Sequence, residues 1–258
     1  MAHSVSITVL GSGSPIVMVH GFALDHRMWQ YQIEEFSKSH TVIAVDVPGC
    51  GKSPLSRNAS MADLAEEIYS AIQPHINGQP AVYMGLSMGG YIGWEMLSRY
   101  RSAFRAAVMC DTRAAADLPP TAEGRRQMAK KVLEEGAASV LAPMIPRLLS
   151  DETQAKQPDI VDLMQKMMFV VGSQTIHDHQ IAMAQRRDFT AVLSDFTLPV
   201  LLICGTEDIL TPPKEMKRLA EKLPHAIYVE IEKAGHMAPL EQPIIVNKHI
   251  REFLASML

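Results

Sequence analysis

The chain has 258 residues, of which 47% are hydrophobic, and a formal net charge of −4. This length is enough for one large α/β domain, or two small ones, with a sizeable core. The sequence has no basic patch or tail, which argues against a nucleic-acid partner. No apolar run approaches the ~20 residues of a membrane span, and the first residues lack a charged segment followed by a long apolar one, so no membrane association is expected.

Seven short runs have the character of strands. Several are continuously apolar, as expected for a parallel sheet that is covered on both faces. The expected strands cover residues 6–10, 16–20, 41–45, 81–84, 106–110, 200–204 and 227–231. Helices are expected between them at residues 29–37, 61–76, 91–100 and 214–223. This alternation predicts an α/β fold with a doubly wound, mostly parallel sheet.

Residues 114–188 break the alternation, because no convincing strand lies within them. The segment is rich in Ala, Met, Arg and Gln, and Pro143, Pro146 and Pro158 are expected to separate three or four helices. An all-helical insertion between two strands predicts a cap over the carboxyl edge of the sheet, where α/β folds bind ligands. The expected domains are therefore a core of residues 1–113 and 189–258 and a cap of residues 114–188. A helical subdomain without a role at the site is the alternative.

Residues 85–89 have the sequence Gly-Leu-Ser-Met-Gly and lie between an apolar run and a predicted helix. A serine between two glycines at a strand-to-helix turn is the pattern of a nucleophile elbow, where a strained backbone lifts the hydroxyl out of the sheet. Side chains at positions 85 and 89 would collide with the neighbouring strand and helix, which explains the glycines. Ser87 is the candidate nucleophile. A glycine-rich turn with an incidental serine is the alternative.

A serine nucleophile needs a base, and the base needs an orienting acid. In this type of elbow the chain order is Ser, then acid, then His. Asp208 and His236 each follow a predicted strand downstream of Ser87, so all three are expected at one edge of the sheet. Asp208 is the expected orienting acid and His236 the expected base. Two other carboxylates remain possible acids: Glu207, which should point the other way, and Asp111, which follows the strand at 106–110.

Negative charge builds on the carbonyl oxygen during attack and needs an oxyanion hole. One expected donor is the backbone N–H of Met88, at a helix N-terminus. The other is the N–H of Phe22, in the loop after the strand at 16–20. Gly21 would allow the turn in that loop, and His20 is expected to be structural.

Five motifs together resemble the α/β-hydrolase superfamily. They are His-Gly-Phe at 20–22, Asp-Val-Pro-Gly-Cys-Gly-Lys-Ser at 46–53, Gly-Leu-Ser-Met-Gly-Gly at 85–90, Gly-Thr-Glu-Asp at 205–208 and Gly-His at 235–236. Within the superfamily the chain looks most like small serine esterases and 3-oxoadipate enol-lactonase-like hydrolases. Such proteins usually have two strands before the one that leads into the His-Gly loop, whereas only one is found here. The first edge strand is therefore expected to be absent or shortened, and the cap to follow the sixth strand position of the family.

The resemblance implies a serine hydrolase that cleaves carboxylic esters or lactones through an acyl-enzyme, and no cofactor or metal. Related dehalogenases and epoxide hydrolases carry aspartate at the elbow, and position 87 is serine. A C–C bond hydrolase or a perhydrolase would use the same triad, although perhydrolases commonly have a proline after the oxyanion loop, where this chain has Phe22-Ala23-Leu24. A non-catalytic small-molecule receptor of this fold is the alternative from another class. The sequence leaves the oligomeric state open.

Five further groups of residues resemble parts of a functional site. Residues 49–53 fail as a phosphate-binding loop because Asp46 stands where a glycine is required, and His177 and His179 diverge on a helix, which argues against a metal pair. The cysteines have no metal-ligand spacing; Cys110 and Cys204 are expected to be buried, and a reduced, cytoplasmic compartment is expected.

The methionines of the predicted cap suit both a core and an adaptable apolar pocket: Met128, Met144, Met164, Met167, Met168 and Met183. Most of the arginines in or beside the predicted cap are expected to be solvated, and one that reaches inward could bind a substrate carboxylate, as an enol-lactone would need: Arg113, Arg125, Arg126, Arg147, Arg186 or Arg187.

Overall fold

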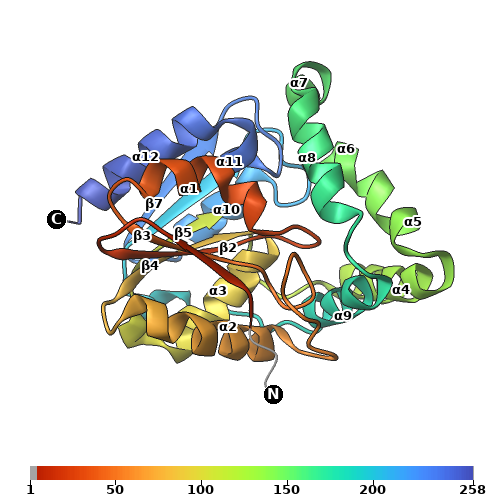
Figure 1. Ribbon diagram of the computed structural model, residues 1–258, viewed down its shortest axis with the longest axis horizontal. Coiled ribbons are helices and arrows are strands. Elements are labelled where there is room, and N and C mark those ends of the chain that lie inside the picture. Colours follow the sequence, from red (N-terminus) through yellow and green to blue (C-terminus); the bar gives the residue numbers. More distant parts are fainter. Residues whose placement is uncertain (1–4, 258) are drawn as a thin grey trace.

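The computed structural model describes residues 5–257, and within them a single seven-stranded sheet forms the centre of the molecule (Figure 1). The strands are β1 (Ile7–Leu10), β2 (Pro15–Val19), β3 (Thr41–Val45), β4 (Ala81–Leu86), β5 (Phe104–Cys110), β6 (Val200–Gly205) and β7 (Ala226–Ile231). Their order in the sheet is β1-β3-β2-β4-β5-β6-β7. Only β1 is antiparallel to its neighbour, which confirms the doubly wound, mostly parallel sheet.

Burial explains the continuous apolar runs. Every residue of β2, β4 and β6 is buried, so these strands have no polar face. The edge strand β1 is more open, and Val9 and Leu10 are 40% and 45% exposed. No strand precedes β1 within residues 5–257, and residues 1–4 lie outside the described part of the chain.

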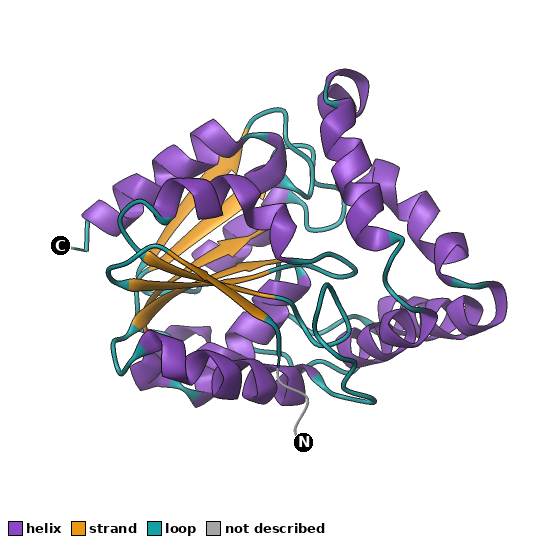
Figure 2. Ribbon diagram, in the orientation of Figure 1, coloured by secondary structure: helices purple, strands orange, loops and turns teal. Residues whose placement is uncertain are grey.

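Helices cover both faces of the sheet (Figure 2). On one face lie α1 (Gln30–Phe36), α11 (Ala238–Glu241) and α12 (Pro243–Ala255), and on the other lie α2 (Met61–Ile76) and α3 (Met88–Arg99) (Figure 1). A further helix, α10 (Pro213–Ala220), packs against β6 and β7. Within residues 5–257, no helix combines the length and the apolar character that a bilayer crossing requires.

The segment between β5 and β6 is helical and projects to one side of the sheet (green in Figure 1). It contains α4 (Pro119–Glu135), α5 (Ala137–Leu141), α6 (Ile145–Leu148), α7 (Asp151–Lys156), α8 (Pro158–Met168) and α9 (Ser173–Ala184). The prediction of three or four helices was wrong. Pro143 lies in a 3-10 helix, Ala142–Met144, and Pro146 and Pro158 lie in the first turns of α6 and α8. A missing N–H costs nothing at these positions, so the prolines begin helices rather than separate longer ones.

Candidate active site

Ser87 lies in the turn between β4 and α3, with φ 52° and ψ −113°. A positive φ is unusual for a residue with a side chain and marks a strained backbone. The turn is held by the Ser87 N–H, which donates to Cys110 O at 3.0 Å, and by Thr112 Oγ1, which donates to Ser87 O at 2.8 Å. A Cβ added at Gly85 would lie 2.6 Å from Gly89 O, and one at Gly89 would lie 2.3 Å from Val19 O, so close packing requires both glycines.

His236 and Asp208 form a buried pair across the loops that follow β7 and β6. His236 Nδ1 donates to Asp208 Oδ2 at 2.8 Å, and both residues are 3% exposed. Asp208 Oδ1 also accepts the N–H groups of Leu210 at 2.7 Å and Thr211 at 3.0 Å, and the Thr211 hydroxyl donates to Oδ2. Burial alone would raise the pKa of Asp208, but His236 and the hydrogen bonds hold that pKa well below its ordinary value. The carboxylate is therefore ionised at neutral pH.

Ser87 and His236 line the same cavity. No hydrogen bond joins their side chains in the part of the chain from residue 5 to residue 257. Because Asp208 accepts the Nδ1 proton of His236, Nε2 is the ring nitrogen left to accept a proton. Serine–histidine contacts are often long in a site without substrate and shorten when one binds.

The two competing carboxylates lie elsewhere. Glu207 Oε2 accepts the N–H of Asp151, at 3.3 Å, and so faces the helical segment. Asp111 is fully buried with φ 45°, and its Oδ1 accepts the N–H of Gly205 at 2.8 Å, while its Oδ2 has no partner among the described residues. Burial, followed by the nearby charge of Asp208, raises the pKa of Asp111 well above its ordinary value. The geometry pairs His236 with Asp208.

The two backbone N–H groups expected to bind an oxyanion have no acceptor within residues 5–257. Phe22 lines the cavity beside Ser87, and Met88 begins α3. His20 has a structural role, since its Nδ1 donates to Gly21 O at 2.8 Å and its Nε2 accepts the N–H of Val47 at 2.9 Å. Burial lowers the pKa of His20, which keeps the ring neutral as this bonding pattern requires.

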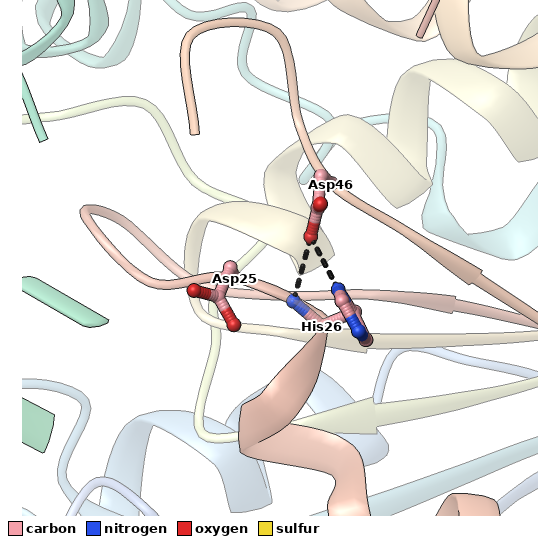
Figure 3. A group of neighbouring side chains, drawn as sticks. All are labelled: Asp25, His26 and Asp46. Carbon is pink, nitrogen blue, oxygen red and sulfur yellow. Dashed lines mark hydrogen bonds and ion pairs between the residues drawn. The ribbon is translucent and has the colours of Figure 1, made fainter. Parts of the chain in front are cut away.

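A second cluster, Asp25, His26 and Asp46, was not identified from the sequence (Figure 3). Both the backbone N–H and Nδ1 of His26 donate to Asp46 Oδ1, at 2.9 and 2.7 Å. Burial alone would raise the pKa of Asp46, but the hydrogen bonds from His26 and from the Lys52 N–H lower it to about 2. Asp25 is paired with Arg27 at 2.7 Å. These donors already satisfy the carboxylates, so the cluster is better explained as a tie between the 21–26 and 46–53 loops than as a metal site.

In two other groups that resemble metal sites, protein groups contact some of the possible ligand atoms, while Asp111 Oδ2 and His179 Nδ1 have no partner among the described residues. Within the sheet edge, Cys204 Sγ lies near Gly205 O and Thr211 O, beside Asp111 and Asp208. On α9, His177 Nδ1 donates to Asp178 at 2.7 Å, and His179 Nε2 lies 3.0 Å from Pro48 O. The candidate pair at 177 and 179 therefore points to different partners.

The cavity has a volume of about 470 Å³ and lies between the sheet edge and the helical segment. Core residues Phe22, Leu86 and Tyr91 line it together with residues of α4, α6 and α9. The methionines divide: Met128, Met144 and Met183 line the cavity, and Met164, Met167 and Met168 are buried in the core. Met183 is also buried, at 2% exposure, so the two interpretations of the methionines overlap.

Glu241 is a residue of the site that the sequence did not indicate. Its Oε1 accepts the N–H groups of Gly235 at 2.8 Å and Met237 at 3.2 Å, and its Oε2 accepts the N–H of Ser150 at 2.7 Å. The N–H of His236 itself donates to Leu148 O at 2.9 Å. Glu241 therefore joins the loop of His236 to the helical segment.

Known proteins match this chain along most of its length. It is 34% identical to a malate-bound thermophilic esterase from Thermogutta terrifontis, with a TM-score of 0.94 over 98% of this chain and 93% of that one. It is 24% identical to 3-oxoadipate enol-lactonase 2 from Acinetobacter baylyi, over 90% of this chain and 85% of the relative. It is also 26% identical to the dihydrolipoyllysine-residue acetyltransferase component of an acetoin cleaving system from Pseudomonas putida, over 94% of this chain but only 64% of that relative.

The sequence pattern of the alpha/beta hydrolase fold matches residues 14–243. That range runs from β2 to the start of α12 and includes the elbow, the Asp208 loop and the His236 loop. The chain belongs to the alpha/beta hydrolase fold family.

Proposed function

We propose that this protein is a serine hydrolase that cleaves carboxylic esters or lactones through an acyl-enzyme. The observation that carries the proposal is the buried His236–Asp208 hydrogen bond, 2.8 Å long, beside a cavity that the strained Ser87 turn also lines. A hydroxyl, an imidazole and an ionised carboxylate in this order are the parts needed for acyl transfer at neutral pH.

In the first half-reaction Ser87 Oγ attacks the carbonyl carbon while His236 Nε2 takes the hydroxyl proton. Asp208 holds the ring through Nδ1 and stabilises the imidazolium that forms, without itself taking the proton. The imidazolium then gives its proton to the leaving alcohol oxygen, and the acyl group stays on Ser87. Water repeats the sequence, with His236 as base, and releases the acid.

The backbone N–H groups of Phe22 and Met88 would stabilise the oxyanion of each tetrahedral intermediate. Neither has an acceptor within residues 5–257, so both are free to donate to a new oxygen. Met88 adds the positive end of α3, which favours negative charge at this position. Such donors are worth about 3 kcal/mol each where their removal has been measured in other enzymes.

Two relatives support the ester or lactone class. The Thermogutta terrifontis protein, 34% identical, is an esterase, and the Acinetobacter baylyi relative is an enol-lactonase. The serine at position 87 fits an acyl-enzyme rather than the alkyl ester that an aspartate nucleophile would form.

The test is Ser87→Ala, assayed with 4-nitrophenyl acetate and with a fluorophosphonate probe. Loss of the nucleophile should lower kcat by about 10⁶-fold, as removal of a triad serine does elsewhere, and should abolish labelling. Ser139→Ala is the matched control, because Ser139 Oγ donates to Gly136 O away from the cavity and its loss should leave both readouts unchanged.

Retained turnover in Ser87→Ala would refute the proposal. Labelling of the wild type without turnover of any ester or lactone would also count against it and would favour a small-molecule receptor. Faster cleavage of ring-cleavage diketones, or faster peracid formation, than ester hydrolysis would favour the C–C bond hydrolase or the perhydrolase.

A further inference from the structure

The charged side chains around the cavity are all of one sign. Among the described residues, Arg113, Arg125 and Arg147 line it, and no aspartate or glutamate does. Within residues 5–257, Arg147 has no ionic partner, and Arg125 shares a single carboxylate, that of Asp117, with Arg186. A cation in a partly enclosed site is weakly hydrated and gains most from an anion brought by the ligand.

Arg113 contacts the protein through Nη2, whereas its buried Nε has no partner among the described residues. Its Nη2 donates to Leu210 O and pairs with Glu215 at 3.3 Å. Leu210 also donates its N–H to Asp208, so Arg113 helps to hold the loop that carries the orienting carboxylate. Arg113 therefore has a structural role in the site.

Arg125, on α4, shares the one ionic partner that it has among the described residues. Its Nε donates to Asp117 Oδ2 at 2.6 Å, while Arg186 Nη2 pairs with the other oxygen of Asp117 at 2.7 Å. Burial alone would raise the pKa of Asp117, but Arg186 and Arg125 lower it, so the carboxylate is ionised. One negative charge between two guanidinium groups leaves one positive charge unbalanced.

An anion bound in the cavity would balance this excess positive charge. The Arg186 side chain is 3% exposed and stacks over the Tyr91 ring, 4.3 Å from its centroid, whereas the Arg125 side chain is 22% exposed and lines the cavity. Gln180 Oε1 accepts from Arg125 Nη1 at 3.2 Å and so fixes the direction of the guanidinium. Arg125 Nη2 has no partner within residues 5–257.

Arg147 supplies a second cation from another helix. It lies on α6, is exposed, and also lines the cavity. It has neither an ion pair nor a hydrogen bond to the protein in the stretch from residue 5 to residue 257. It therefore stands where the cavity meets solvent, with its donors unused.

The geometry points to a substrate that carries a carboxylate in addition to its ester or lactone bond. Arg125, oriented by Asp117 and Gln180, binds that carboxylate, and Arg147 assists at the rim of the cavity. This inference rests on the proposed hydrolase function and names its substrate class. Arginine suits the role because its planar fork matches two carboxylate oxygens at once.

Two matched substrate pairs test the inference. Mono-4-nitrophenyl adipate is compared with 4-nitrophenyl hexanoate, and 4-carboxyphenyl acetate with 4-methylphenyl acetate, which places the carboxylate on the acyl or the leaving side. Arg125→Gln should lower kcat/KM for the carboxylate member of at least one pair by about 10- to 100-fold, as loss of a charge-assisted hydrogen bond predicts. The neutral members should change little. Arg147→Gln should act in the same direction, more weakly and with more dependence on salt.

Arg126→Gln is the control. Arg126 follows Arg125 on the same helix, carries the same charge, pairs with Glu123 at 3.2 Å and does not line the cavity. Its loss should leave both members of each pair unchanged. Equal effects of Arg125→Gln and Arg126→Gln, or a wild type that prefers the neutral member of both pairs, would overturn the inference while leaving the hydrolase function intact.

A binding readout separates this inference from the proposed function. Ser87→Ala protein should bind adipate in isothermal titration calorimetry, and the added Arg125→Gln change should weaken binding about tenfold or more, whereas Arg126→Gln should not. Thermal melts of each variant show that it is folded. Absence of adipate binding by folded Ser87→Ala overturns the inference, and absence of any ester turnover by the wild type overturns the function on which it rests.

Discussion

Asp111 shows how far the state of a residue depends on what surrounds it. The sequence placed this carboxylate at the same sheet edge as Asp208 and left both as possible acids. The structure gives Asp208 hydrogen bonds from His236 and from the 210–211 backbone, which favour its ionised form. Asp111 receives one N–H, from Gly205, and is fully buried beside the charge of Asp208, which favours its neutral form. The sequence predicted that both carboxylates follow a strand. It did not predict how deeply each is buried or which charged groups lie beside it.

The charge state of Asp111 gives a prediction for Asp111→Asn. The raised pKa of Asp111 means that the folded protein keeps a proton that the unfolded chain loses above the ordinary value of 3.8, so stability falls as pH rises from there. Asparagine keeps the shape and the Oδ1 acceptor but removes this penalty. The Tm of the variant minus that of the wild type should therefore increase between about pH 4 and pH 7. Thermal melts across this range measure it, and ester turnover at neutral pH should persist. A difference in Tm that decreases with pH would show that Asp111 is ionised in the folded protein.

At the scale of helices and strands, the predictions were most accurate where neighbouring residues determine the ends of an element. The bounds of α2 were predicted at both ends because they are set locally, by a capping box between Ser60 and Asp63 and by Asn77 in the left-handed conformation. The strands were found because complete burial makes them continuously apolar. The helices from α5 to α8 were not resolved, although local signals were present at the starts of two of them, with Ser150 as the N-cap of α7 and Pro158 in the first turn of α8. α12 was missed, although Pro243 at its start was an available signal.

The link between α11 and the helical segment predicts a coupled effect of Glu241→Gln. Glu241 is buried, and its two oxygens accept three backbone N–H groups from the His236 loop and from Ser150. Glutamine replaces one acceptor with a donor and leaves a buried N–H unpaired, which should cost about 1–3 kcal/mol of unfolding free energy. The loosened His236 loop should also lower kcat, by roughly tenfold, as small misplacements of catalytic groups do.

Chemical denaturation and ester turnover measure the two effects of Glu241→Gln. Glu252→Gln is the control, because Glu252 lies exposed on α12 and pairs with Lys248 at 3.9 Å. Exposed pairs of this kind contribute little to stability. A Glu241→Gln protein with unchanged kcat would show that the His236 loop keeps its position without this link.

At the scale of the whole molecule, the proposed function assigns the reacting groups to the sheet edge and the shape of the cavity to the helical segment. The sheet edge carries Ser87, Asp208 and His236, each on a loop that directly follows a strand, which is why their positions could be inferred from strand prediction. The shape of the cavity depends on how α4, α6 and α9 lie over that edge, and helix packing of this kind leaves no local pattern in the sequence. The positions of the proposed reacting groups were therefore more predictable here than the shape of the cavity. The division also implies that selectivity can be altered from the helical segment without disturbing the reacting groups.

Gly124 provides a place to test this division. It lies on α4 and lines the cavity, and an added Cβ would meet nothing within 4 Å. Gly124→Ala should stabilise the protein by up to about 1 kcal/mol through helix propensity and leave selectivity nearly unchanged. Gly124→Phe should occupy cavity volume and lower kcat/KM for 4-nitrophenyl decanoate by about tenfold, the scale on which pocket shape discriminates, while 4-nitrophenyl acetate turnover and fluorophosphonate labelling persist. An equal loss for both esters in Gly124→Phe would mean that the helical segment controls the reacting groups themselves and that the division of tasks does not hold.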